Sequence, residues 1–178
     1  VDEINAAGGV NGFNFTLDIQ DSQGNPDSAV AAYGKLMDNG MDVSLGGTFS
    51  GETQSIVAAA KADSILVLTA TASSKACIEG NDCAFRVCFN DPAQGAASAN
   101  YIADNNLATK IAVFYASDND YCVGLYDTFA AECETLGLEV VEVQTFTSST
   151  NTDFSTQINA IKDSGAELVF LPIYAAEA

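Results

Sequence analysis

The sequence contains no histidine, and it has few basic residues. Without histidine it can form neither a Ser-His-Asp triad, nor a Cys-His pair, nor a zinc site that uses histidine. Six basic residues stand against 24 acidic ones, which gives a formal net charge of −18. Such an acidic chain repels the phosphates of nucleic acids and of anionic lipids, so we expect neither as a direct ligand.

Long apolar runs and several common motifs are also missing. The longest apolar runs, at 64–68 and 168–173, span five or six residues, and about twenty are needed to cross a bilayer. There is no P-loop, "GTFSG" is not a Gly-x-Ser-x-Gly elbow, and "GGVNG" follows a helix-like segment instead of a strand. We therefore expect a binding protein that is not an enzyme, with no catalytic residue, metal or cofactor.

The pattern that is present predicts an α/β fold. Short apolar, β-branched runs alternate with amphipathic stretches of ten to fifteen residues, which is typical of βαβ units in a mostly parallel sheet. The opening "VDEINAAGGVNG" reads as the tail of a helix that ends at Gly8 and Gly9. We expect strands at 13–21, 41–47, 64–70, 84–89, 110–116, 138–146 and 166–173, and helices at 26–39, 51–63, 91–106, 121–136 and 153–164.

Hydroxyl groups follow two successive predicted strands. Thr48 and Ser50 come after one strand, and Thr71 and Ser73 after the next. In open α/β sheets, ligands bind outside the carboxyl ends of the strands, and neutral hydroxyls suit a small carboxylate because they cost little to desolvate. The alternative is that Ser50 or Ser73 only caps a helix or turn.

The acidic residues and the cysteines give weaker signals. Asp18, Asp21, Asp118 and Asp120 are spaced like surface carboxylates of an acidic chain, so we do not expect a metal there. None of the five cysteines forms a Cys-x-x-Cys pair. The candidates for a disulfide are Cys77, Cys83 and Cys88; five reduced thiols are the alternative.

Several segments together resemble a known family. They include "VDEINAAGGVNGF" at 1–13, "GGTFSGETQSIVAAA" at 46–60, "FRVCFNDPAQGAASANYIADN" at 85–105 and "KIAVFYASDNDYCVGLYDTFAAECETLG" at 110–137. This order of segments, which runs along almost the whole chain, resembles the type I periplasmic binding proteins, in particular the Leu/Ile/Val substrate-binding proteins of ABC transporters.

The resemblance implies two α/β lobes that close on a ligand by a hinge. Residues 1–107 would form the first lobe without its first strand, which is central in the family's sheet, and 108–178 the first part of the second lobe. The lobes would join near residues 106–109. The implied function is to capture a small aliphatic amino acid outside the cytoplasm, in the periplasm or anchored to lipid, and to deliver it to a membrane permease. We also expect a natural protein about twice as long as this chain.

The resemblance also implies roles for individual residues. Ser50 resembles the hydroxyl that binds the ligand carboxylate, with Thr48 beside it, while Thr71 resembles a backbone contact and Ser73 a hydroxyl contact to the amino-acid head group. Asp91 lies where the family has an acidic residue near the cleft. The second-lobe tyrosines that close over the ligand would be Tyr121 and Tyr174.

Three other functions are compatible with the same pattern. The ligand of such a scaffold can be an amide, an aromatic acid or a polar amino acid. A sensory receptor domain shares the fold but is joined to a membrane-spanning signalling module. An α/β enzyme with a flavin or nucleotide at the same strand ends is disfavoured, because the glycine fingerprints and histidine are missing.

Overall fold

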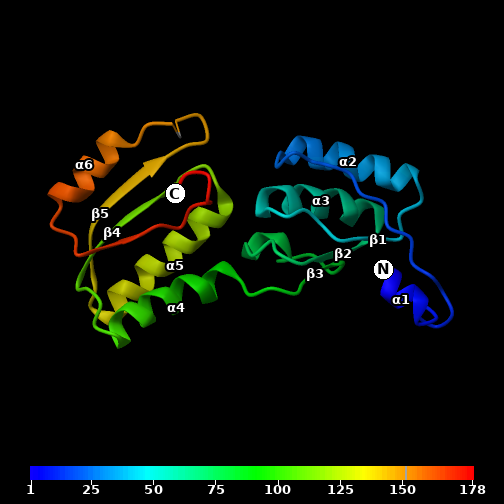
Figure 1. Cartoon of the computed structure of the whole chain (residues 1–178), viewed down its shortest axis with the longest axis horizontal. Coiled ribbons are helices and arrows are strands. Elements are labelled where there is room, and N and C mark those ends of the chain that lie inside the picture. The colour runs from blue at the N-terminus through cyan, green and yellow to red at the C-terminus, as the bar shows by residue number, and fades with distance from the viewer. Residues whose placement is uncertain (151) are drawn as a thin grey trace.

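The chain folds into two α/β lobes that lie side by side (Figure 1). The structure is a computed structural model that describes residues 1–150 and 152–178. Each lobe contains a three-stranded parallel sheet. The N-terminus lies in one lobe and the C-terminus in the other. The α/β class and the parallel sheets expected from the sequence are confirmed.

The first lobe is built around a sheet of order β1-β2-β3. Two helices, α2 and α3, pack on it and share a core that includes Tyr33, Val57 and Val67. The short helix α1 lies near the N-terminus, and one turn of 3₁₀ helix, η1, follows β2. The elements are α1 (Asp2–Ala6), α2 (Pro26–Asp38), β1 (Val43–Ser44), α3 (Ser50–Asp63), β2 (Leu66–Thr69), η1 (Lys75–Cys77) and β3 (Ala84–Arg86).

The second lobe has a sheet of order β5-β4-β6. Its core includes the fully buried side chains of Ile111 and Phe129, and the Phe129 ring stacks on that of Phe170 with centroids 4.0 Å apart. Such stacking adds to the free energy gained from burying the rings. The elements are α4 (Asp91–Asp104), β4 (Lys110–Ala116), α5 (Asp120–Leu136), β5 (Glu139–Phe146), α6 (Ser155–Asp163) and β6 (Leu168–Phe170).

Helix α4 belongs to the core of the second lobe. Its buried residues Ala99 and Ile102 pack in the same cluster as Ile111 of β4 and Phe129 of α5. The chain therefore crosses between the lobes before α4, at residues 87–90 (Figure 1). The boundary expected at residues 107 and 108 is wrong for α4, because this helix buries its apolar face against the second lobe.

Residues 13–21, expected to be a strand, form none. Apart from an isolated bridge between Val10 and Phe13, this segment pairs with no described strand. Residues 15–20 and β1 line a groove of about 510 Å³, and among the described residues no backbone hydrogen bond joins the two segments. The apolar side chains of the segment are consequently exposed; Phe13, for example, is 78% exposed. The alternation of apolar and polar residues indicates a preference for extended backbone, but it does not show whether a neighbouring strand is present to pair with it.

Three helices begin with the same capping device. Asn25, Asn90 and Asn119 precede α2, α4 and α5, and each side-chain oxygen accepts a backbone N–H from the first turn. Asparagine is a strong N-cap because it satisfies amides that have no partner within the helix. The caps fix where α4 and α5 begin, which positions the first-turn residues that face the other lobe.

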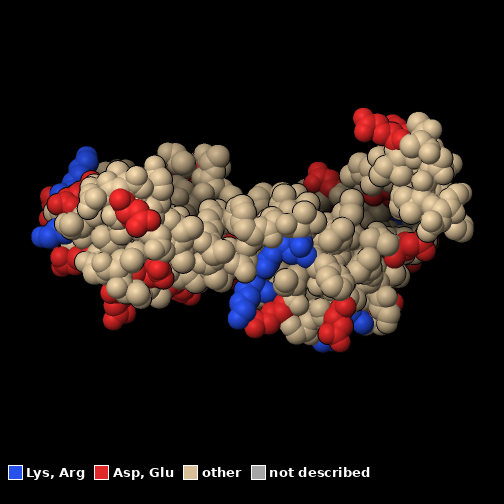
Figure 2. Space-filling view, turned by 90° about the horizontal axis from the view of Figure 1, so that it is seen from below, with Lys and Arg blue, Asp and Glu red and all other residues tan. Residues whose placement is uncertain are grey.

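Acidic side chains are spread over both lobes on the face shown in Figure 2, where basic side chains are few. The formal charge of −18 is therefore not confined to one patch of this face. Within residues 1–150 and 152–178, no helix combines the length and the apolar character that crossing a membrane requires.

Because α4 packs closely on α5, we expect a side chain at Gly95 to destabilise the protein. A Cβ atom there would lie 2.1 Å from Thr128 Oγ1 and 2.8 Å from the Leu125 carbonyl oxygen. We expect Gly95→Ala to lower the free energy of unfolding of the full-length protein by about 2 kcal/mol, because the helices must separate. Urea denaturation measures this change.

Gly34 in α2 is a matched control, because a Cβ atom there would meet nothing within 4 Å. Alanine is the better helix former, so Gly34→Ala should raise the free energy of unfolding by up to about 1 kcal/mol. A Gly95→Ala protein as stable as the wild type would contradict the close contact between α4 and α5.

Candidate functional site

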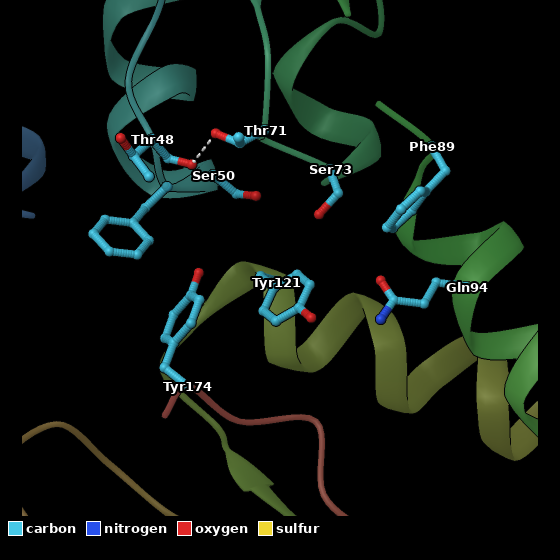
Figure 3. A pocket seen from close by; sticks show the side chains of 9 residues that line it. Thr48, Ser50, Thr71, Ser73, Phe89, Gln94, Tyr121 and Tyr174 are labelled. Carbon is cyan, nitrogen blue, oxygen red and sulfur yellow. Dashed lines mark hydrogen bonds between the residues drawn. The ribbon is translucent and has the colours of Figure 1, made fainter. Parts of the chain in front are cut away.

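A cavity of about 280 Å³ lies where the two lobes meet (Figure 3). The loops after β1 and β2 form one wall, and residues from the crossing segment, α4, α5 and the C-terminal loop form the rest. None of its described lining residues is charged. They are Thr48, Phe49, Ser50, Thr71, Ser73, Phe89, Gln94, Tyr121 and Tyr174.

The first-lobe wall is a set of hydroxyls from two neighbouring loops. Ser50 is the first residue of α3, and its Oγ accepts the Ser74 N–H at 3.2 Å. Thr71 Oγ1 donates to the Thr48 carbonyl at 2.8 Å, so the two loops are joined at a second point. The parallel strands β1 and β2 end at the same edge of the sheet, which brings these loops together.

Hydrogen bonds and glycines hold the loop before α3 in place. Thr53 Oγ1 donates to the Gly47 carbonyl at 3.0 Å and accepts the Gly47 N–H at 3.1 Å. The buried carboxylate of Glu52 accepts the Phe49 N–H at 3.2 Å and the hydroxyl of Ser22. Gly46 has φ +68°, a conformation that favours glycine. The loop therefore presents Ser50 from a supported backbone.

The second-lobe wall consists of two stacked tyrosines. The rings of Tyr121 and Tyr174 are 5.3 Å apart and nearly parallel, and Phe49 of the first lobe meets Tyr174 edge-on at 5.0 Å. Burial raises the pKa of Tyr174 above its usual value. Its hydroxyl is therefore protonated at neutral pH and available as a hydrogen-bond donor. This aromatic contact already bridges the lobes.

Asp91 lies beside the cavity but is not one of its lining residues. Its side chain is 1% exposed, and its two carboxylate oxygens have no hydrogen-bond partner among the described residues. Burial raises the pKa of Asp91, while the nearby Ser73 hydroxyl and the Arg86 charge lower it in part. Its Oδ2 would be 3.0 Å from a Cβ atom at Gly124, so α5 approaches the carboxylate closely.

The structure brings together six of the seven predicted ligand-binding residues. Thr48, Ser50, Thr71, Ser73, Tyr121 and Tyr174 all line the cavity, and Asp91 lies beside it.

Sequence reasoning missed Phe49, Phe89 and Gln94, which line the same cavity. Gln94 had a detectable signal, because it follows Asp91 by three residues on one helix and so shares its face. The Oε1 atom of Gln94 is buried and has no hydrogen-bond partner among the described residues. Phe49 lies in the hydroxyl-rich loop itself.

No disulfide joins the candidates Cys77, Cys83 and Cys88 in the structure, in which all five cysteines are described and free, as in the alternative of five reduced thiols. The thiol of Cys77 instead donates to the Ser50 carbonyl at 3.5 Å, and that of Cys83 faces Asn81 Oδ1 at 3.0 Å. Each of these two thiols therefore has a local hydrogen-bond partner. In the described part of the chain, no group of three or more His, Cys, Asp or Glu side chains is arranged to hold a metal ion.

Hydroxyls, aromatic rings and a buried acid suit binding of a small polar molecule. The hydroxyls donate to a carboxylate, the rings exclude water, and the acid favours a positive charge. Among the described lining residues, none pairs a nucleophile with a base.

Comparisons with known proteins identify a family and several relatives. A family model described as periplasmic binding protein matches residues 1–178. The chain is 29% identical over 178 residues to Leu/Ile/Val-binding protein homolog 3 of Brucella melitensis, covering 99% of this chain and 48% of that protein. It is 31% identical to an amino acid binding protein of Pseudomonas aeruginosa, covering 95% of this chain and 45% of that one. The chain thus spans about half the length of these relatives.

Among solved structures, one similar protein is the branched-chain amino acid transporter substrate binding protein of Streptococcus pneumoniae in complex with isoleucine. The TM-score is 0.86 at 25% identity, with 96% of this chain and 48% of that chain covered. A solute binding protein of Rhodopseudomonas palustris in complex with 3,4-dihydroxybenzoic acid shares the fold, with a TM-score of 0.82 at 18% identity, over 94% of this chain and 46% of that chain.

The burial of three thiols predicts their reactivity. Burial raises the pKa of Cys77, Cys122 and Cys133 to about 11 each. At pH 8 only about one in a thousand of each would be thiolate. We expect iodoacetamide to modify the half-buried Cys83 and Cys88 first in the native protein, as followed by mass spectrometry. Early modification of Cys77, or its recovery in a disulfide, would contradict the structure.

Proposed function

Because the chain belongs to the periplasmic binding protein family, we propose that it forms the ligand-binding part of a solute-binding protein that captures a branched-chain or other aliphatic amino acid. The observation that carries this proposal is that hydroxyls of one lobe and tyrosines of the other line one and the same cavity. A ligand held there touches both lobes. Its binding energy therefore favours the closed arrangement over the open one.

The carboxylate of the amino acid would bind at Ser50. The Ser50 oxygen already accepts the Ser74 N–H, so its own proton is free to donate into the cavity. Ser50 also opens a helix of 14 residues, whose N-terminus carries partial positive charge. Both features favour an anion at this end of the cavity.

The ammonium group would lie toward Ser73 and Asp91. Ser73 contributes a hydroxyl to the first-lobe wall, nearer to Phe89 and Gln94 than Thr48 is, as Figure 3 shows. Behind it lies the carboxylate of Asp91, which is buried and lacks a hydrogen-bond partner among the described residues. A buried carboxylate attracts a positive charge strongly, because there is little water to screen it. The site would therefore favour a negative charge near Ser50 and a positive charge near Asp91.

The second candidate ligand is an aromatic acid. Four of the lining residues, Phe49, Phe89, Tyr121 and Tyr174, are aromatic, and offset stacking would hold a flat ring between them. The Rhodopseudomonas palustris protein of the same fold was crystallised with such a ligand. An aromatic acid lacks an ammonium group, however, and would leave Asp91 without a partner.

The partner that fits this function is a membrane permease of an ABC transporter, and the location that fits it is outside the cytoplasm. Relatives named as Leu/Ile/Val-binding proteins and the Streptococcus pneumoniae transporter component support this assignment. The alternative is a sensory receptor of the same fold, which would pass the closure of the lobes to a signalling module.

Titration calorimetry tests the proposal. We expect the full-length protein, refolded after removal of bound ligand, to bind leucine, isoleucine or valine one-to-one with micromolar or tighter affinity. Ser73→Ala should weaken binding roughly 10- to 100-fold, because it removes one hydrogen bond to a charged group. The exposed Ser149→Ala is the control and should change nothing. If no amino acid gives heat but 4-hydroxybenzoate binds, the proposed ligand is wrong and an aromatic acid takes its place.

Asp91→Asn separates ligand recognition from stability. We expect it to weaken leucine binding about tenfold, because the ammonium group loses a nearby negative charge. The urea midpoint of the ligand-free protein should not fall, since the variant removes a buried charge without a hydrogen-bond partner. Asp27→Asn removes an acid from the first turn of α2 and is the control. A lower midpoint with unchanged affinity would make Asp91 a purely structural residue.

A further inference from the structure

Arg86 is the cation whose hydrogen bonds lead toward the proposed carboxylate position. The described lining residues are all uncharged, and the chain as a whole carries −18. An anion entering this site therefore meets an unfavourable overall field and no direct positive partner. Arg86, the last residue of β3, lies behind the lining.

The guanidinium of Arg86 donates hydrogen bonds to the backbone of the loop after β2. Its Nη1 donates to the Ser73 carbonyl at 2.8 Å and to the Ser74 carbonyl at 2.9 Å. The Ser73 carbonyl accepts a second hydrogen bond, from the Asp91 N–H, at 3.1 Å. Among the described residues Arg86 makes no salt bridge. Its hydrogen bonds are therefore directed to the peptide groups of this loop.

A continuous chain of hydrogen bonds leads from Arg86 to the cavity. The Ser73 carbonyl and the Ser74 N–H belong to one peptide group, and that N–H donates to Ser50 Oγ at 3.2 Å. The hydroxyl of Ser50 is next to the cavity. Ser50, Ser73 and Ser74 are all buried, so the chain is shielded from bulk water. The order is guanidinium, carbonyl, amide N–H, hydroxyl, ligand.

Each hydrogen bond in such a chain strengthens the next. A cation bound to a carbonyl oxygen draws electron density from the peptide group, which makes its N–H a better donor. That N–H in turn makes the accepting hydroxyl a better donor through its own proton. Hydrogen bonds that end on a charged group gain the most from this polarisation.

We propose that Arg86 is a positioning residue that supplies positive charge to the ligand carboxylate through the Ser73–Ser74 peptide group and the Ser50 hydroxyl. The inference rests on the proposed function, because it requires a carboxylate at Ser50. It goes beyond it by assigning to a residue outside the cavity the preference for an acid over the uncharged amide.

A purely structural role for Arg86 makes a different prediction. If Arg86 only holds the loop, its loss would weaken the binding of an acid and of its amide equally. If Arg86 only offsets the charge of Asp91, the effect of its loss would be the same in a Ser50→Ala background. If Arg86 acts through Ser50, its removal would weaken mainly the binding of the acid. The selectivity between acid and amide, and not the affinity alone, therefore distinguishes the two roles.

The test is calorimetry of the refolded, ligand-stripped full-length protein with two pairs of probes: L-leucine with L-leucinamide, and 4-hydroxybenzoate with 4-hydroxybenzamide. The leucine pair is measured near pH 6.5, below the usual pKa of an α-amino group, so that both amines are charged. Arg86→Gln removes the charge, and Arg86→Lys retains it with a single donor group. Lys61→Gln is the control, because Lys61 also donates to a carbonyl, that of Gly80, and does not line the cavity.

Arg86→Gln should weaken binding of the acid at least tenfold more than binding of its amide. Arg86→Lys should retain part of the selectivity, and Lys61→Gln should change none of it. In a Ser50→Ala background the effect of Arg86→Gln on the acid should largely disappear, since the chain is already broken. Melting curves of the ligand-free variants identify any that are unfolded, and Arg86→Lys then decides the comparison.

The two proposals fail in different ways. Equal losses for acid and amide, or an undiminished loss in the Ser50→Ala background, would overturn the role of Arg86 and leave amino-acid capture intact. Binding of 4-hydroxybenzoate without binding of leucine would overturn the amino-acid ligand, and the benzoate pair would then decide the role of Arg86. A wild-type protein that binds neither acid would overturn both.

Discussion

The hydrogen bond from the Ser74 N–H to the Ser50 hydroxyl joins the two loops on which the site depends. These loops follow β1 and β2, which are parallel neighbours and so end at the same edge of the sheet. The bond leaves the Ser50 proton free for a ligand, while the α3 N-terminus, Arg86 and the second-lobe tyrosines are arranged around it. In the proposed complex, recognition would therefore depend on the backbone as much as on side chains.

Buried polar groups without partners mark the other end of the site. The carboxylate of Asp91 and the Oε1 atom of Gln94 lack hydrogen-bond partners among the described residues. Leaving such groups unsatisfied costs stability, and a ligand that donates to them recovers part of that cost. In the proposed complex, a ligand that donates to these groups would therefore bind at a place that costs the ligand-free protein stability.

Much of this arrangement follows from the sequence, and the failures have physical causes. The strand-end hydroxyls at Ser50 and Ser73 were identifiable because the fold class fixes where strand ends meet. The strand at 13–21 was wrong because alternation reports a local preference, whereas a strand also needs a neighbour to pair with. The lobe boundary was misplaced because the packing of α4 on α5 depends on Gly95, whose contacts no pattern shows. Phe89, on the crossing segment, and Gln94, on α4, line the same cavity.

The most direct measurement is a crystal structure of the full-length protein with its amino acid bound. We expect a carboxylate oxygen within hydrogen-bond distance of Ser50 Oγ, an ammonium group on the side of Ser73, and Tyr121 and Tyr174 against the ligand. A ligand bound elsewhere, or one bound in this cavity with its carboxylate directed away from Ser50, would contradict carboxylate binding at the Ser50 hydroxyl.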